Sequence, residues 1–379
     1  MKVLLIGECY SGNVGDQIVA SITKELLGKL YPSSSIYLVD ISGREELNTA
    51  HEDQTLTLSQ RLRMLLLKYI PVLDVVRKLI SNNKRRIRYR AIINSDNYNL
   101  AVFCGGQVIN STFTEPMDTL AKLLHQANIP TIYSSVGLGI VKEKDIQIFK
   151  RVLEYPNVRA ISCRCEEKRF NSFFGFENGR VQGTFDPGIC ASDFWGISRK
   201  NKTSLVGLGI MCSSRISNKR MILFWKQIIS YLDEMGIPWR LFYTGTWKDY
   251  LLAKEVLFSL NITNPECKIK EDIYTPLDLI NELSQFSKII SFRLHSHIIS
   301  YSMGIPTIAI RWDKKIDDFF AKIGYSDRVF DIDAEVTKII DKLKECDYIS
   351  SISIQKAMKL YSELFAKQCV DALETKGVV

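Results

Sequence analysis

The stretch FRLHSH, residues 292–297, places an arginine and two of the chain's four histidines in an otherwise apolar region. The run KIIS before it predicts a buried strand, and SHIISYSMG after it predicts a helix ending at Gly304. A buried guanidinium or imidazole needs a partner, so the turn between these elements is a candidate active site. Arg293 and His295 can point together into a cleft, and an imidazole suits proton transfer. His297 falls in the first helical turn and is expected to be structural; a metal site with His295 would lack further ligands.

A second candidate is the loop Gly12-Asn13-Val14-Gly15-Asp16, between the apolar run 2–7 and an expected helix. At a helix N-terminus, backbone N–H groups can hold an anion or a sugar, and Asn13 and Asp16 could contribute side chains. The alternative is a plain turn in which Asp16 is the helix N-cap.

Other candidates also follow expected strands. Arg164 comes after the run 158–163, where a guanidinium could clamp an anion, or else pair with Glu166 or Glu167. Further loops that either line a cleft or form turns with positive φ contain Gly105, Gly106, Gln107 and Gly137. The charged residues after the run 306–310 indicate an anionic ligand unless they form an exposed loop: Arg311, Asp313, Lys314 and Lys315.

Short apolar runs alternate with amphipathic helical patterns along the whole chain, which is typical of a parallel, doubly wound α/β sheet. The alternation restarts after the polar, turn-rich segment 182–204, which we expect to connect two domains. The sequence therefore predicts two Rossmann-like domains facing across a cleft, residues 1–198 and 199–379. A basic helical insert lies at about 55–92, and a long C-terminal helix, 351–376, could pack back on the first domain.

Composition narrows the class of protein. The 379 residues are 46% hydrophobic and carry a formal charge of +8, too diffuse to indicate nucleic acid. The nine cysteines lack CxxC pairs and favour a reducing, cytoplasmic location. No run reaches the roughly 20 apolar residues needed to span a bilayer, and the N-terminal apolar run is too short for a signal peptide.

The segment 61–90 is unusually basic, with ten basic residues and one acid, Asp74. One interpretation is a solvated helix pair with a charged turn. The other is a basic amphipathic element that contacts anionic lipid headgroups at the inner membrane surface.

Taken in order, the motifs GNVGDQIVA, FCGGQVI, SSVGLGI, ISCRCEE, FDPGI and FRLHSHIISYSMGIPTIAIRWDKKIDDFFAKIGY resemble the polysaccharide pyruvyl transferases over roughly 300 residues. The block from RLHS to GIP is the specific part. The resemblance implies a GT-B-like fold, phosphoenolpyruvate as the donor, and no metal or other cofactor. It also implies a saccharide acceptor of a capsule, exopolysaccharide or cell wall, or its lipid-linked precursor, that receives the pyruvyl group as a ketal.

By the same resemblance, His295 is the proton donor or base, Arg164 and Arg293 clamp the donor, and Asp16 binds an acceptor hydroxyl. Leu294 and Ser296 belong to the matching motif, and the second domain is the phosphoenolpyruvate side. The sequence departs from the family pattern at two positions that bear on the geometry of donor and acceptor binding. Cys165 stands where relatives usually carry an acid, and Cys104 replaces the first glycine of a glycine triplet.

Two other functions fit the same architecture. One is a GT-B glycosyltransferase that uses a nucleotide sugar, although no acidic residue suited to a ribose is evident after FRLHSH. The other is a non-catalytic saccharide-binding protein of a polysaccharide-assembly complex.

Overall fold

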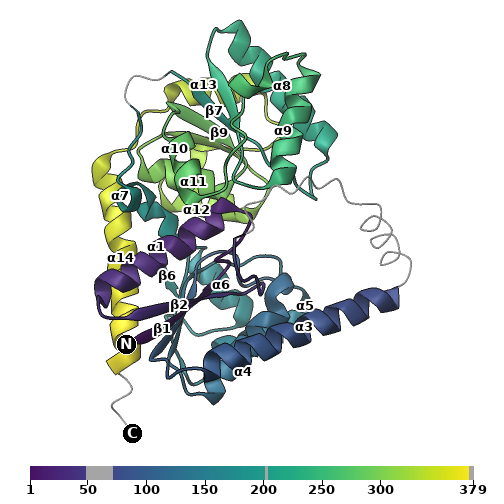
Figure 1. Ribbon diagram of the computed structural model, residues 1–379. Helices are drawn as coiled ribbons and strands as arrows, with labels where there is room; N and C mark the ends of the chain where they lie inside the picture. The colour runs from purple at the N-terminus through teal and green to yellow at the C-terminus, as the bar shows by residue number, and fades with distance from the viewer. Residues whose placement is uncertain (48–70, 201–203, 375–379) are drawn as a thin grey trace.

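The computed structural model describes residues 1–47, 71–200 and 204–374, which form two lobes, each built on a parallel sheet (Figure 1). The strands of the first sheet, in spatial order, are β2 (Ser35–Asp40), β1 (Lys2–Gly7), β3 (Leu100–Cys104), β4 (Thr131–Val136), β5 (Val158–Cys163) and β6 (Gln182–Gly183). Those of the second are β11 (Val329–Phe330), β10 (Thr307–Ile310), β9 (Lys288–Ser291), β7 (Val206–Gly209) and β8 (Trp239–Phe242). Every strand pairing is parallel.

Helices connect the strands. In the first lobe they are α1 (Val14–Leu30), α3 (Pro71–Asn94), α4 (Thr114–Gln126), α5 (Glu143–Leu153), α6 (Glu167–Phe174) and α7 (Ala191–Trp195). In the second they are α8 (Asn218–Glu234), α9 (Trp247–Ser259), α10 (Pro276–Leu283), α11 (Leu294–Ser302), α12 (Lys314–Lys322) and α13 (Val336–Glu345). The last helix is α14 (Ser351–Glu374). Short 3₁₀ helices are Ser111–Phe113, Pro187–Cys190, Pro265–Cys267 and Ser326–Arg328.

The predicted α/β fold with two Rossmann-like domains is confirmed. Its physical basis is the burial of the strands on both faces: every residue of β3, β4, β7 and β10 is buried. The segment 182–204, expected to be a simple connection, contains β6, a 3₁₀ helix and α7. These elements escaped prediction because a two-residue strand and single helical turns carry no periodicity.

Both sheets have the same topology, with their first strand between the second and the third. In the first sheet β1 lies between β2 and β3, and in the second β7 lies between β8 and β9. Connections leave the sheet in opposite directions at such a switch point, so a crevice opens at the carboxyl ends of the two central strands. The loops after β1, β3 and β9 therefore all open on the same region between the lobes.

The last helix, α14, spans the two lobes along one side of the molecule (yellow in Figure 1). Its apolar face includes the buried residues Tyr361 and Phe365 and packs against β4 and β5 of the first lobe. Gln368 accepts a hydrogen bond from Ser162 Oγ of β5 at 3.1 Å. The C-terminal segment thus belongs physically to both lobes.

The basic insert expected at about 55–92 lies partly outside the described residues. From residue 71 onward it is α3, which packs on α4 and buries Tyr89 and Ile93 of its C-terminal half, while its N-terminal end projects from the first lobe (Figure 1). Among the described residues, no helix is long and apolar enough to cross a membrane.

Candidate active site

The turn between β9 and α11 presents Arg293 to the cleft between the lobes. Its Nε donates to Asp249 Oδ2 at 3.0 Å, and a second guanidinium nitrogen donates to the same oxygen. Asp249 lies in the first turn of α9, is fully buried, and also accepts the backbone N–H of Cys212 at 2.7 Å. Burial raises the pKa of Asp249, and Arg293 opposes the rise. This carboxylate fixes the plane of the guanidinium and leaves its other N–H groups for a ligand.

His295 joins this turn to the first lobe. Its Nε2 lies 3.3 Å from Nη1 of Arg164 and 3.9 Å from Oδ2 of Asp186, and the ring is 8% exposed. Because a guanidinium can only donate, Nε2 accepts this hydrogen bond and the ring proton resides on Nδ1. Burial lowers the pKa of His295, although Asp186 opposes the effect. The imidazole is therefore a neutral base.

Arg164, directly after β5, forms an ion pair with Asp186. The alternative considered from the sequence, a pair with Glu166 or Glu167, is not formed. Asp186 comes from the sequence FDPG after β6 and also accepts the N–H of Gly188 at 2.9 Å. Burial alone would raise its pKa, but Arg164 and His295 hold the pKa of this carboxyl below its ordinary value. The three side chains form a buried charged cluster that exists only because the two lobes meet.

The loop before α1 supplies the polar residues on the first-lobe side. Asn13, not Asp16, is the N-cap of α1, and its Oδ1 accepts from the N–H of Gly15 at 3.3 Å. Its Nδ2 donates to Asp16 Oδ2 at 2.9 Å, and Thr244 of the second lobe donates to its Oδ1 at 3.2 Å. The Asp16 carboxylate is thus held in place and lines the cleft.

The glycines act as spacers around these side chains. A Cβ on Gly15 would lie 2.1 Å from Nδ1 of His295, and one on Gly137 would lie 2.8 Å from Nε of Arg164. Gly106, with φ of 71°, accepts the N–H of Gly137 at 2.7 Å. Gly105 and Gly106 are not among the residues that line the cleft, whereas Gln107 lines it.

A bulge in β4 contributes to this arrangement. The pairing of β4 with β5 shifts register between Tyr133 and Val136, and Ser135 adopts φ of 55°. Its N–H donates to Ser162 Oγ at 3.0 Å and its hydroxyl to the Phe185 carbonyl at 2.7 Å. These bonds hold an unfavourable backbone conformation where the strand turns towards Gly137.

The charged residues after β10 divide into two groups. Lys315 lines the cleft, and its Nζ donates to Gln107 Oε1 at 3.0 Å. Lys314 is exposed and lies on a separate surface hollow beside Glu166. Asp313 caps α12 by accepting the N–H of Lys315 at 3.1 Å and pairs with Arg215. Arg311, the fourth charged residue of this stretch, pairs with Asp317 and Asp331 and does not line the cleft. The structure therefore brings only one of these four residues to the site.

The remaining motif residues have contrasting positions. Leu294 lines the cleft. Ser296 is fully buried and donates to the carbonyl of Arg293 at 2.6 Å, which stabilises the turn. His297 lies in the core, with Nε2 3.1 Å from the carbonyl of Ser291, and burial lowers its pKa to about 3.

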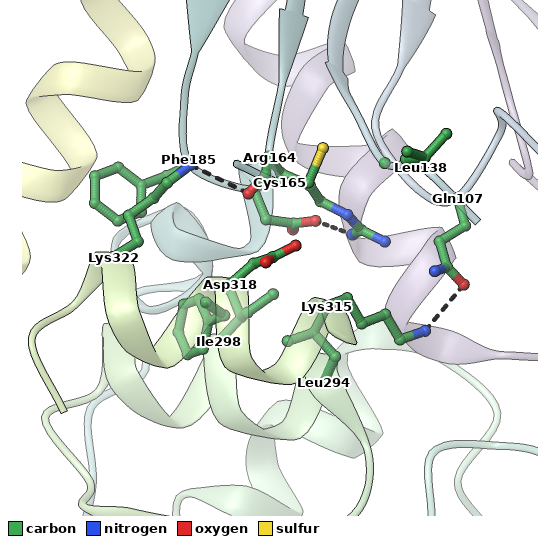
Figure 2. Close-up of a pocket in the computed structure, with 13 residues that line it drawn as sticks. Gln107, Leu138, Arg164, Cys165, Phe185, Leu294, Ile298, Lys315, Asp318 and Lys322 are labelled. Atoms are coloured by element: carbon green, nitrogen blue, oxygen red, sulfur yellow. Dashed lines mark hydrogen bonds and ion pairs between the residues drawn. The ribbon is translucent and has the colours of Figure 1, made fainter. Parts of the chain in front are cut away.

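Together these groups enclose an open cleft of about 790 Å³, large enough for a small anion and a sugar. It is lined by Glu8, Asn13, Asp16, Gln107, Asn110, Thr112, Phe113, Arg164, Thr244, Arg293, Leu294, His295, Trp312 and Lys315. A smaller cavity adjoins it behind Arg164 and Lys315, with Phe185, Ile298 and Phe319 among its apolar walls (Figure 2).

Sequence reasoning missed several of these residues. Glu8 lines the cleft, and burial together with Asp16 raises its pKa to about 8. Asp186 lies in a motif that was used for the resemblance, so a role could have been assigned to it. Asp249 follows no motif, and only the tertiary structure reveals it. The described residues contain no group of three or more His, Cys, Asp or Glu that could hold a metal ion.

Comparison with solved structures shows the class of fold. S. aureus MnaA, in a co-structure with UDP, has a TM-score of 0.59 and 11% identity, covering 98% of this chain and 97% of its own. The UDP-GlcNAc 2-epimerase of Neisseria meningitidis, bound to UDP-GlcNAc, has a TM-score of 0.57 and 10% identity, covering 99% and 100%. That of Methanocaldococcus jannaschii has a TM-score of 0.57 and 11% identity, covering 98% and 100%. The chain is thus a two-domain, GT-B-like protein.

The family follows from the sequence. The model of the polysaccharide pyruvyl transferase family matches residues 13–314, most of the chain, and the protein belongs to that family. The expected resemblance is confirmed, and membership makes the chain a transferase of polysaccharide pyruvylation. No curated protein sequence matches it significantly.

Proposed function

We propose that the protein transfers the pyruvyl group of phosphoenolpyruvate to two hydroxyls of a sugar, forming a ketal. The acceptor would be a capsular, exopolysaccharide or cell-wall saccharide, or its lipid-linked precursor. The observation that carries this proposal is the cluster of Arg164, Asp186 and His295 in a cleft that also contains Arg293. Phosphoenolpyruvate has a carboxylate and a phosphate, and the two arginines offer oriented N–H donors for both.

The proton balance of the reaction suits a neutral imidazole. The first sugar hydroxyl adds to the central carbon of phosphoenolpyruvate while the methylene carbon gains a proton. The phosphate then leaves with the C–O electron pair, and the second hydroxyl closes the ketal. His295, neutral because of burial, can take the proton of the first hydroxyl and deliver one to the methylene carbon. Arg164 and Arg293 stabilise the negative charge of the donor, so no metal or further cofactor is required.

Asp16 is proposed as the acceptor-binding group. It lies at the N-terminus of α1 on the side of the cleft opposite Arg293, and Asn13 fixes its carboxylate. A carboxylate held in this way can accept a hydrogen bond from a sugar hydroxyl and orient it towards the donor.

The test is phosphate release from phosphoenolpyruvate in the presence of a panel of lipid-linked and free oligosaccharides. His295→Ala should abolish release, while His125→Ala, a matched control that removes a ring stacked on Tyr155 in the first lobe, should retain it. Unaltered release by folded His295→Ala would contradict the role of the imidazole.

The structural neighbours suggest a second candidate, because S. aureus MnaA is in a co-structure with UDP and the N. meningitidis epimerase is bound to UDP-GlcNAc. A thermal-shift comparison distinguishes it from pyruvyl transfer. Stabilisation by UDP sugars and not by phosphoenolpyruvate would favour a nucleotide-sugar transferase. Binding of saccharide without turnover of either donor would favour a non-catalytic role.

We further propose that the protein works in the cytoplasm with α3 against the inner membrane surface. The stretch 79–94 contains five basic residues and no acid, and Leu79, Ile80 and Ile87 are 62%, 54% and 63% exposed. Lys84, Arg86 and Arg90 are exposed among them. Apolar side chains surrounded by cations match the boundary between acyl chains and anionic headgroups.

Sedimentation with vesicles tests this contact. Vesicles rich in phosphatidylglycerol should bind the protein more than neutral phosphatidylcholine vesicles, and salt should weaken the binding. Replacing Leu79, Ile80 and Ile87 with serine should reduce it, whereas Phe258→Ser, which removes an 84% exposed ring from the other lobe, should not. Equal sedimentation with both vesicle types would refute the proposal.

A further inference from the structure

Lys315 occupies a distinctive position between the two cavities. It lies in the first turn of α12 and lines both the main cleft and the smaller cavity behind it (Figure 2). Its Nζ lies 3.0 Å from Gln107 Oε1 and 4.4 Å from the centre of the Trp312 ring. The ammonium is therefore held by a neutral amide and an aromatic face, in reach of whatever binds beside Arg164.

The charge of Lys315 is compensated differently from that of its neighbours. Arg293 is paired with buried Asp249, and Arg164 with buried Asp186. Within the described part of the chain, no carboxylate lies within ion-pair distance of the Lys315 ammonium. Of the three cations that line the main cleft, Lys315 is thus the one whose charge is left for an anionic ligand.

The groups around Lys315 also make its proton labile. The charged or titratable groups around it in the cleft are Glu8 after β1, Asp16 from α1, Arg164 after β5, Arg293 and His295 at the N-terminus of α11, and Asp313 at the cap of α12. Burial and the two guanidiniums lower its pKa to about 8, and the carboxylates of Asp313 and Asp16 oppose this effect only in part. A lysine with such a pKa can lose and regain a proton near neutral pH, which an arginine cannot do.

The proposed reaction leaves one proton transfer without a residue. Each of the two sugar hydroxyls loses one proton. One of these protons ends on the methylene carbon, which becomes the methyl group, and the other must end on the phosphate, which leaves as hydrogen phosphate. His295 accounts for the first transfer only, so a second group has to serve the leaving group.

We propose that Lys315 binds the phosphate of phosphoenolpyruvate and donates a proton to it as it leaves, a role that rests on the proposed function. The bond between the central carbon and the bridging oxygen breaks, its electron pair stays with the phosphate, and the ammonium proton moves to a phosphate oxygen. Lys315 regains a proton from the second hydroxyl as that oxygen attacks the central carbon. Arg164 and Arg293 hold the donor but keep their protons throughout.

Three variants separate binding from proton transfer: Lys315→Met, Lys315→Arg and the matched control Lys314→Met, which removes an exposed ammonium one residue away. Calorimetric titration measures phosphoenolpyruvate affinity, phosphate release measures turnover, and thermal unfolding shows that each variant is folded. Lys315→Met should lose about tenfold or more in affinity and about 100-fold or more in turnover. Lys315→Arg should keep affinity within about threefold and still lose about 100-fold in turnover, and Lys314→Met should resemble wild type in both.

The pH dependence gives a readout that a structural role would not move. Affinity of the wild-type protein for phosphoenolpyruvate should fall above about pH 8, because free Lys315 loses its charge and Glu8 in the same cleft, whose pKa is also about 8, gains one. The fall should be clearly shallower in Lys315→Arg, which keeps only the contribution of Glu8. Full turnover by Lys315→Arg would overturn proton donation, and unchanged affinity in Lys315→Met would overturn the phosphate contact. If the wild-type protein itself fails to bind phosphoenolpyruvate, the proposed function fails, and with it this role.

Discussion

The close approach of Gly15 to His295 gives the sharpest prediction. Replacing Gly15 with alanine adds one methyl group at the second residue of α1, inside the interface between the lobes. The added carbon would lie 2.1 Å from Nδ1, 2.4 Å from Cγ and 2.6 Å from Cβ of the His295 side chain. Since ordinary contacts begin near 3.4 Å, the ring must move by about 1.3 Å, or α1 must move away from α11.

Neither movement is available without cost. The ring is 8% exposed and contacts Arg164 on its other edge, so a shift of that size disrupts the contact between the lobes. A displacement of about 1 Å in a catalytic group commonly reduces turnover about 100-fold. Overpacking costs about 1 to 3 kcal/mol, and the gain of up to ~1 kcal/mol from placing alanine in a helix offsets part of it. We therefore expect a net loss of about 0 to 2 kcal/mol.

The assay compares Gly15→Ala with Gly28→Ala, which lies in the same helix with nothing within 4 Å of its added carbon. The control should be stabilised by up to about 1 kcal/mol and keep full activity. Urea unfolding measures stability, and phosphate release from phosphoenolpyruvate measures turnover. Turnover of Gly15→Ala within about threefold of wild type would refute the packing argument, as would a gain in stability equal to that of the control.

Three further predictions follow from buried charges. Asp249→Asn leaves the guanidinium of Arg293 without its charge partner and should lower the free energy of unfolding, measured in urea, by about 2 to 4 kcal/mol. This loss is below the full range for buried ion pairs because the Arg293 side chain is 19% exposed. No measurable loss would contradict the pairing. Burial lowers the pKa of His297 from 6.5 to about 3, so below pH 6.5 the unfolded chain binds more protons than the folded one, and stability should fall by about 2 kcal/mol between pH 7 and pH 5 on this account. His297→Gln should flatten that fall in the same unfolding assay, and an unchanged slope would argue against it. The fall of the Lys315 pKa from 10.5 to about 8 corresponds to a destabilisation of at most ~3.4 kcal/mol. After allowance for partial solvation, Lys315→Met should raise the free energy of unfolding by about 1 to 2 kcal/mol, while the control Lys314→Met should not raise it. A Lys315→Met protein less stable than wild type would contradict an unpaired cation at this position.

The turn between β9 and α11 shows how far local sequence can go. Its residue types and the change from an apolar run to a helical pattern place Arg293 and His295 in the turn between a strand and a helix. The structure has Arg293 there, as the N-cap of α11, and His295 one step further on, in the first turn of the helix. The sequence could not predict their partners, because Asp249 and Asp186 lie 44 and 109 residues away from Arg293 and His295 along the chain. Hydrogen bonds over such separations depend on the packing of whole helices and strands.

The pair Lys314 and Lys315 illustrates the limit at the level of single residues. Two adjacent lysines after a strand are equivalent in composition, and only the phase of α12 decides which one faces the cleft. Asp313 fixes that phase by capping the helix, and the packing of Ile316 and Phe320 on the core of the second lobe maintains it. One lysine therefore joins the site and the other faces solvent.

The sequence by itself determined the α/β alternation, the repeat of that alternation in two halves, and the motifs that mark the family, because each depends on local periodicity or on short spacing. The tertiary structure alone decided that α14 spans both lobes, that Gly15 makes room for an imidazole from a helix 280 residues later, and that two arginines are neutralised while Lys315 is not. These properties arise where the lobes meet. There, burial and charge depend on side chains that are distant in sequence and are brought within a few ångströms by packing.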